Sequence, residues 1–251
     1  LYDTPAALLS LAVMLALFYL MFGRKLHVDD AHKNALAGLD EREEIKNPIL
    51  LRQSVVMIVL VVVGFMAHGS LGIESCVVAL TAAGVLMLIS GERIEEALAH
   101  VEWTTLVFFA GLFIIVGALS EVGVIGMLAQ ALIDVTGGST FVAMLVLLFA
   151  SAIVSSFLDN IPFVATMIPI LLSMEATGMD VAPLWWAVSL GACLGGNGTL
   201  IGASANVVMS DISRKNGHVI TFAHFFKVGF PTMLATVAVS AIYLIVRFPP
   251  M

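Results

Sequence analysis

Long apolar blocks separated by short polar stretches are the main feature of the sequence. The uninterrupted blocks cover about residues 4–22, 55–67, 73–90, 103–119 and 228–247. Because a helix needs about 20 apolar residues to cross the hydrocarbon core of a bilayer, these blocks predict membrane helices. Between them, the charged segment 24–52 indicates a solvated linker, and the pieces 91–102 and 121–136 indicate short amphipathic or interfacial helices.

Two further apolar blocks are interrupted by polar residues near their middle. Residues 140–174 are broken at Asp159-Asn160-Ile161-Pro162, and residues 184–210 at Gly195-Gly196-Asn197-Gly198-Thr199. In a bilayer, non-helical backbone is tolerated only where it is buried in protein or lines a wet cavity. Two broken membrane elements in one chain are typical of transporters that work by alternating access around a site near the midplane.

The first break holds a carboxylate. Asp159 is the only charged side chain between Asp134 and Glu175, and Pro162 disfavours a helical residue before it. A carboxylate inside the bilayer is costly unless it meets water, a cation or a proton, so Asp159 indicates a Na⁺ or H⁺ ligand at a hairpin tip. Asn160 would help to close the turn and cap the second arm. The alternative is that Asp159 is only a helix cap in a loop at the membrane surface.

The second break is rich in glycine. Five glycines among residues 191–202 would weaken a continuous helix, and they suit an unwound segment whose backbone groups face a ligand. Asn197 and Thr199 offer neutral oxygen ligands there, and Ser204 and Asn206 stand one to two turns further on. The alternative explanation is tight helix packing, because the glycines recur with the small-xxx-small spacing of membrane helix pairs.

Composition supports a membrane protein and argues against other classes. The chain is 60% hydrophobic and 12% charged, against about 45–50% and 25% in soluble domains. A formal charge of -7 without a basic cluster argues against a nucleic-acid partner. Cys76 and Cys193 lie far apart in apolar segments, so we expect buried small residues and no disulfide or metal site. Catalytic motifs of hydrolases are absent, and no second carboxylate is expected to pair with Asp159, so we expect no enzyme.

The basic residues predict an orientation. Of the eleven Lys and Arg residues, six lie in 24–52, one in 91–102 and three in 211–227. If residues 140–174 enter the membrane and return to the same side, these ten residues share one side. The positive-inside rule makes that side, and with it the loops 24–52, 91–102 and 211–227, cytoplasmic.

Three stretches resemble the ion transporter superfamily, in the ArsB/NhaD permease branch. That branch holds arsenite permeases, type D sodium–proton antiporters and the melanosomal P protein. The stretches are residues 101–113 (VEWTTLVFFAGLF), 156–163 (SFLDNIPF) and 195–206 (GGNGTLIGASAN). The resemblance covers about residues 53–247. It implies an all-α integral membrane fold of two inverted repeats, each with a re-entrant hairpin and a broken helix, usually in a homodimer.

The resemblance also implies a binding site. Its substrate or ion ligands would be Asp159, Asn160, Asn197, Thr199, Ser204 and Asn206. The residues that shape it would be Ser156, Pro162, Gly195, Gly196, Gly198 and Gly202. A Na⁺ ion would be held by Asp159, Asn160 and Asn197, and no cofactor is expected beyond the coupling ion, Na⁺ or H⁺.

Only one hairpin motif and one Gly-Asn-Gly-Thr motif occur here, whereas the family needs two of each. We therefore expect residues 1–23 to be the last helix of a missing N-terminal half, supplied by the same protein or by a second chain. Residues 24–52 would link it to a C-terminal transport repeat, 53–251, with its hairpin at about 139–174 and its broken helix at about 184–210.

The carboxylate at the tip favours one transport reaction. Asp159 attracts Na⁺ or H⁺ and repels anions, so the sequence favours a secondary active, Na⁺/H⁺ antiporter-like protein of a prokaryotic inner membrane, with lipid and a small ion as its partners. The alternative is a permease for arsenite or another anion, coupled to H⁺ or Na⁺. An alternative of another class is a membrane assembly subunit that transports nothing.

Overall fold

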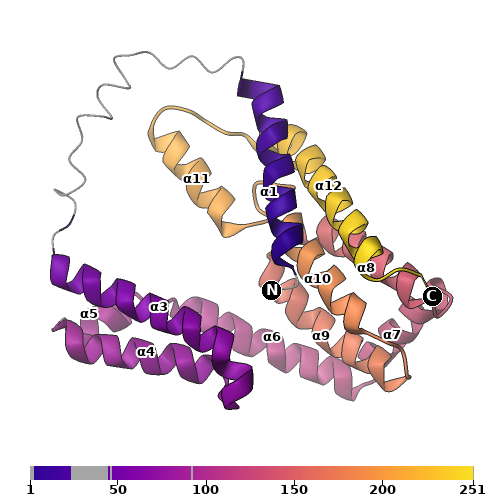
Figure 1. Cartoon of the computed structure of the whole chain (residues 1–251), viewed down its shortest axis with the longest axis horizontal. Coiled ribbons are helices and arrows are strands. Elements are labelled where there is room, and N and C mark those ends of the chain that lie inside the picture. Colours follow the sequence, from indigo (N-terminus) through magenta and orange to yellow (C-terminus); the bar gives the residue numbers. More distant parts are fainter. Residues whose placement is uncertain (1–2, 24–44, 46, 92, 251) are drawn as a thin grey trace. The chain divides into compact units, whose positions relative to one another are not determined.

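The computed structural model describes residues 3–23, 45, 47–91 and 93–250, and every regular element in these ranges is helical, as the sequence predicts (Figure 1). The chain divides into two compact units, Leu1–Leu26 with Leu106–Met251, and His27–Thr105. Helix α6, Trp103–Glu121, crosses the boundary between them.

The smaller unit is built on a helical hairpin, α3 (Pro48–Leu71) and α4 (Ser75–Ser90). Asn47 caps α3, because its side chain accepts a hydrogen bond from the Leu50 amide at 3.0 Å, and Pro48 needs no donor in the first turn. The Gln53 side-chain amide donates to the Ile89 carbonyl at 3.1 Å, which ties the start of α3 to the end of α4. A short helix, α5 (Ile94–Ala99), follows.

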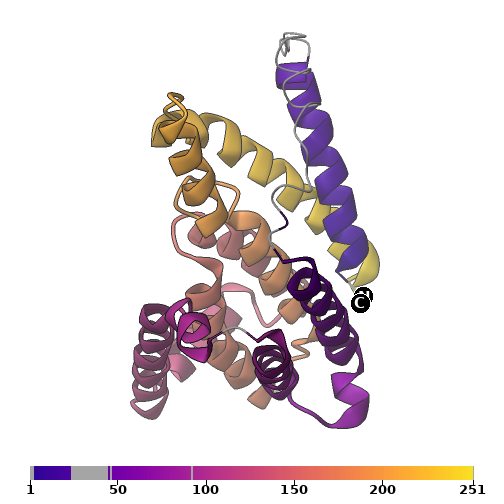
Figure 2. The same cartoon turned by 90° about the vertical axis from the view of Figure 1, so that its left-hand side faces the viewer.

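The larger unit is built around α10 (Ala182–Gly195). Helix α10 packs on α8 (Thr140–Ser155), α9 (Asn160–Ala176) and α12 (Phe222–Arg247), while α1 (Thr4–Phe18, extended by a π-helical turn, Tyr19–Gly23) packs on α12. Figures 1 and 2 both show α1 alongside α12. The largest fully buried apolar side chains of the core are Met144, Leu148, Leu171, Met174, Leu184, Val188, Met233, Val237 and Leu244.

Four described helices are long and apolar enough to cross a membrane: Thr4–Gly23, Pro48–Ser70, Trp103–Glu121 and Phe222–Arg247. Their apolar side chains are largely exposed, for example Ile58 at 63% and Ile114 at 73%. Such a large exposed apolar surface is unstable in water and is expected where lipid covers the protein.

Both predicted interruptions are breaks in helices. Residues 156–159 separate α8 from α9, and residues 196–203 separate α10 from α11 (Ser204–Lys215). The piece predicted at 121–136 is a separate helix, α7 (Val124–Val135), bent by 113° from α8. The turn between α7 and α8 contains Gly137 and Gly138, whose φ angles of 59° and 70° suit glycine best.

Two expectations need correction. Cys76 and Cys193 are exposed rather than buried, because apolar segments of a membrane protein face lipid as well as the core. Helix α3 begins at Pro48, inside the segment expected as linker, because Asn47 and Pro48 form a helix start there. Residues 24–44 of that linker lie outside the described residues.

Candidate functional site

Two serines at the end of α8 join the two breaks. The Ser155 hydroxyl donates to the Ala192 carbonyl at 2.8 Å, and the Ser156 hydroxyl lies 3.0 Å from the Gly195 carbonyl and 2.7 Å from that of its own helix at Ala152. Both serines are fully buried. The last four carbonyls of a helix lack helical partners, so these hydroxyls satisfy groups that the end of α10 leaves open.

Thr199 strengthens the same junction from the other side. Its side chain is fully buried, and its hydroxyl donates to the Ser156 carbonyl. The Asn206 side-chain amide donates to the Gly196 carbonyl at 2.9 Å and to the Thr199 carbonyl at 3.0 Å. The first turn of α11 therefore folds back and closes the unwound segment 196–203.

Space, rather than backbone conformation, requires glycine at this junction. A Cβ at Gly191 would lie 2.5 Å from the Leu148 carbonyl oxygen, and a Cβ at Gly195 would lie 2.5 Å from the Ala152 carbonyl oxygen. At Gly202 it would lie 2.7 Å from the Ser156 carbonyl oxygen. The packing explanation therefore holds for the glycines that face α8, and the unwound segment is present beside it.

Three more glycine and proline positions complete the predicted frame. A Cβ at Gly196 would meet the Gly202 carbonyl oxygen at 2.9 Å, and a Cβ at Gly198 would meet Ser156 and Met233. Pro162 lies in the first turn of α9, where its missing donor is not needed.

Asp159 lies at the start of α9. One of its carboxylate oxygens accepts a hydrogen bond from the Ile161 amide at 3.1 Å, so it caps the helix, and the side chain is exposed. Asn160 follows and is half-buried. The cap that the sequence offered as an alternative is thus present, and within the described residues no partner engages the second Asp159 oxygen.

Asn197 and Asn206 line a cavity of about 370 Å³ in the larger unit. Its other lining residues come from α1, the segment before α12 and α12 itself: Met14, Phe18, Phe22, Ile220, His224, Phe225, Val228, Gly229 and Thr232. The cavity is mostly apolar, and none of its described lining residues is Asp or Glu. Ser204, the remaining predicted ligand, is exposed at the first position of α11.

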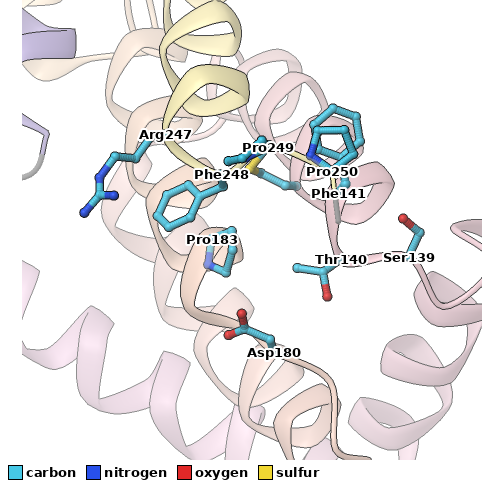
Figure 3. A pocket seen from close by; sticks show the side chains of 10 residues that line it. Ser139, Thr140, Phe141, Asp180, Pro183, Arg247, Phe248, Pro249 and Pro250 are labelled. Carbon is cyan, nitrogen blue, oxygen red and sulfur yellow. The ribbon is translucent and has the colours of Figure 1, made fainter.

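A second cavity, of about 500 Å³, lies at the other end of α12 (Figure 3). It lies between the starts of α8 and α10 and the end of α12, where Thr140, Asp180, Pro183 and Phe248 are among its lining residues. The Asp180 carboxylate accepts from the Ala182 amide at 3.0 Å. None of the predicted ligands lines this cavity.

The end of α11 is polar and charged. The Asp211 carboxylate pairs with Lys215 at 2.7 Å and Arg214 at 2.6 Å, and these contacts hold the pKa of Asp211 below its usual value. All three side chains reach water. The first five residues of the segment 211–227, which the sequence predicts to be a loop, belong to helix α11.

Sequence reasoning found Ser156, Thr199, Asn206 and the glycines, which the structure brings together in one junction. It missed Ser155, whose signal is a second serine in an otherwise apolar block. Of the two residues it expected to hold Na⁺ together, Asp159 lies at the start of α9 and Asn197 lines the cavity of about 370 Å³.

Exposed helices of membrane length indicate a multi-pass membrane protein, and helix breaks such as the two joined here are common in transporters. The chain belongs to the citrate transporter (CitMHS) family, whose profile matches residues 1–191. The resemblance to the superfamily that holds this family is therefore confirmed.

Curated relatives agree with this assignment. The chain is 42% identical over 252 residues to an uncharacterized transporter of Mycobacterium tuberculosis, covering 99% of this chain and 58% of the relative. It is 40% identical over 248 residues to a 46 kDa membrane protein of Mycobacterium leprae, covering 98% and 58%. It is 36% identical over 264 residues to the human P protein, covering 97% and 31%. The chain thus spans a little more than half the length of the mycobacterial relatives.

Proposed function

We propose that the complete protein is a secondary active transporter that exchanges Na⁺ for H⁺ by alternating access, with Asp159 as the carboxylate that binds both ions in turn. The observation that carries this proposal is the position of Asp159. It lies three residues after Ser156, whose side chain and carbonyl join the two breaks, and one of its oxygens is not committed to the helix cap.

Helix lengths support a site inside the membrane. Helix α8 has 16 residues and α10 has 14, which correspond to about 24 Å and 21 Å. The hydrocarbon core is about 30 Å thick, so neither helix crosses it alone. This supports a re-entrant hairpin at α8–α9, a broken helix at α10–α11, and the inverted-repeat architecture in which a second half supplies the matching pair.

The hydrogen bonds across the breaks support a common movement. Ser155, Ser156 and Thr199 tie the end of α8 to the end of α10 through three bonds with buried partners. A displacement that separated the breaks would leave these groups unpaired in a dry environment, which is costly. The hairpin tip and the unwound segment therefore move as one body when the site changes the side to which it opens.

Electrostatics explains the exchange. A carboxylate in a low-dielectric site binds a monovalent cation or a proton strongly, and binding either one neutralises it. Na⁺ and H⁺ then compete for Asp159, with Asn160 and backbone oxygens completing the Na⁺ shell. Among the described residues, no group of three or more His, Cys, Asp and Glu is arranged to hold a metal ion, so such a shell relies on neutral oxygens.

A second candidate function is transport of an anion, such as citrate or arsenite, driven by H⁺ or Na⁺. The observation in its favour is the cavity lined by Asn197, Asn206 and His224, which has no carboxylate in its lining. In that reaction Asp159 binds the coupling ion and the substrate occupies the cavity. The remaining reading, an assembly subunit without transport, predicts that Asp159 has no effect on flux.

The setting of the whole protein follows the same proposal. We place it in a prokaryotic inner membrane as a homodimer, with segments 24–52, 91–102 and 211–227 on the cytoplasmic side and with an N-terminal half that completes the site. The coverage of 58% of the mycobacterial relatives supports a longer protein.

The test uses the complete protein in proteoliposomes, with Na⁺-driven H⁺ flux measured by an internal pH dye. We expect flux from the wild type, none from Asp159→Asn, and normal flux from Asp134→Asn, an exposed carboxylate on α7 that accepts a hydrogen bond from Gln130 at 2.8 Å. Normal flux from Asp159→Asn contradicts the role of Asp159. If the wild type has no Na⁺-driven flux but takes up citrate or arsenite, the second candidate replaces the first.

A further inference from the structure

Asp3 stands at the N-cap of α1 but does not cap the helix. Aspartate at this position normally accepts a hydrogen bond from an amide of the first turn. Here the carboxylate turns to another helix, and its Oδ2 accepts a hydrogen bond from the Ser189 hydroxyl on α10 at 3.1 Å. A carboxylate that gives up a cap for a contact between helices indicates a role other than starting the helix.

The second oxygen of Asp3 is the unusual feature. Oδ1 is buried from solvent and has no hydrogen-bond partner among the residues that the structure describes. An ionised carboxylate oxygen without a partner in a dry environment is costly, and the cost falls when a proton or a cation reaches it. The geometry therefore favours a state of the transport cycle in which a proton or a cation neutralises the Asp3 carboxylate.

Asp3 contacts α10 in the middle of that helix rather than at its end. Ser189 is the eighth residue of α10, about 10 Å from the start of that helix, and Gly195 at the break lies about 9 Å further on. Cys193 lies one turn after Ser189 on the same face of α10, close enough to interact with the Asp3 charge. Asp3 thus contacts the part of α10 that leads to the break.

The packing of α1 fixes this position. The Ser10 hydroxyl lies 3.4 Å from the Thr236 carbonyl and 3.4 Å from the Ser240 hydroxyl, and Ala6 is fully buried. Helices α1 and α12 run antiparallel (Figure 1), and the C-terminal half of α12 carries Tyr243 and Arg247.

The other titratable groups near Asp3 lie on the neighbouring elements. On α10 this is Cys193, and beyond Asn160 on α9 it is Asp159. On the C-terminal half of α12 the titratable side chains are Tyr243 and Arg247.

We propose that Asp3 is a second proton-binding carboxylate of the transport unit, which takes up and releases a proton beside the Ser189 hydroxyl while Asp159 handles the exchanged ion. This proposal rests on the proposed function and extends it. Uptake converts the carboxylate and one H⁺ from water into a carboxylic acid, and release reverses that step. The ligand is a proton rather than a metal ion, because Asp3 and Ser189 offer only three side-chain oxygens, too few for a Na⁺ shell.

The test is infrared difference spectroscopy of the complete protein in lipid nanodiscs, between alkaline and acidic buffers. Wild type and Asp211→Asn should show a carboxylic acid carbonyl band, shifted in heavy water, that Asp3→Asn lacks. Ser189→Ala should keep the band but move its titration midpoint to higher pH, because the lost hydrogen bond favoured the ionised form. A spectrum of Asp3→Asn identical to that of the wild type overturns the proposal.

The outcomes separate this proposal from the proposed function. If the wild type shows no Na⁺-driven flux but Asp3→Asn still removes the band, the proton site stands and the exchange reaction falls. If flux is normal and neither variant changes the spectrum, the proton site falls alone. If Asp3→Asn fails to fold, as judged by size-exclusion chromatography, the titration midpoint of the carbonyl band in Ser189→Ala tests the proposal instead. A midpoint equal to that of the wild type then overturns the proposal.

Discussion

Replacing Gly195 by alanine tests whether the contact between α8 and α10 holds the two breaks together. The added Cβ would lie 2.5 Å from the carbonyl oxygen of Ala152, 2.8 Å from the Cα of Ala152 and 3.0 Å from the carbonyl carbon of Ala152. Ordinary van der Waals contact begins at 3.4 Å. All three atoms belong to a helix backbone, so no side chain can turn away. The two helices would have to separate by roughly 1 Å.

The expected loss of stability combines three effects. Overpacking of this kind costs about 1–3 kcal/mol. A strained hydrogen bond between the Ser156 hydroxyl and the Gly195 carbonyl adds about 1 kcal/mol. The better helix propensity of alanine offsets about 0.5–1 kcal/mol. We therefore expect a net destabilisation of about 2 kcal/mol.

Gly126→Ala is the matched control for this substitution. Gly126 lies inside α7, and a Cβ there would have nothing within 4 Å. The control should gain about 0.5–1 kcal/mol from helix propensity alone. Denaturant unfolding of the complete protein in mixed micelles, followed by tryptophan fluorescence, measures both variants. If Gly195→Ala is as stable as Gly126→Ala, the close contact between α8 and α10 is not present in the protein.

Two further substitutions test the junction and the charged end of α11. Thr199→Val keeps the shape of the side chain but leaves the Ser156 carbonyl without its hydrogen bond, so it should lower the free energy of unfolding by about 1–3 kcal/mol. Thr199→Ser keeps the hydroxyl and should cost less. Equal losses in the two variants would contradict the hydrogen bond. Lys215 and then Arg214 lower the pKa of Asp211 from its unfolded value of 3.8. The ion pairs therefore stabilise α11 fully above pH 3.8, and this stabilisation is lost as the pH falls through the lower pKa of the folded state. Hydrogen exchange of α11 amides should therefore separate wild type from Asp211→Asn at neutral pH and not in strong acid.

The elements were predictable where the signal is local. Gly137-Gly138 ended α7, Asp159 with Pro162 began α9, and the glycines from 195 to 202 marked the end of α10. Each of these residues acts on its own backbone or on its near neighbours, so a single sequence is sufficient to find it. The burial of Cys76 and Cys193 was not predictable, because apolar residues suit both lipid and protein interior.

The partners within the site were less predictable. Which serine meets which carbonyl depends on how α8 crosses α10, and no sequence pattern states that Ser155 reaches Ala192. Sequence reasoning did not single out Asp3, because its contact with Ser189 joins two helices that lie far apart in the chain. Local chemistry indicated the kinds of residue at the site, and tertiary packing decided their neighbours.

The central claim is that one carboxylate, Asp159, binds Na⁺ and H⁺ in turn. The most direct test is the Michaelis constant for Na⁺, measured from isotopic sodium uptake by the complete protein in proteoliposomes over a range of pH. Competition at one site predicts that the constant rises as the pH falls, approaching about tenfold per pH unit, and that Asp159→Asn abolishes saturable uptake. A constant independent of pH, or saturable uptake in Asp159→Asn, would contradict the claim.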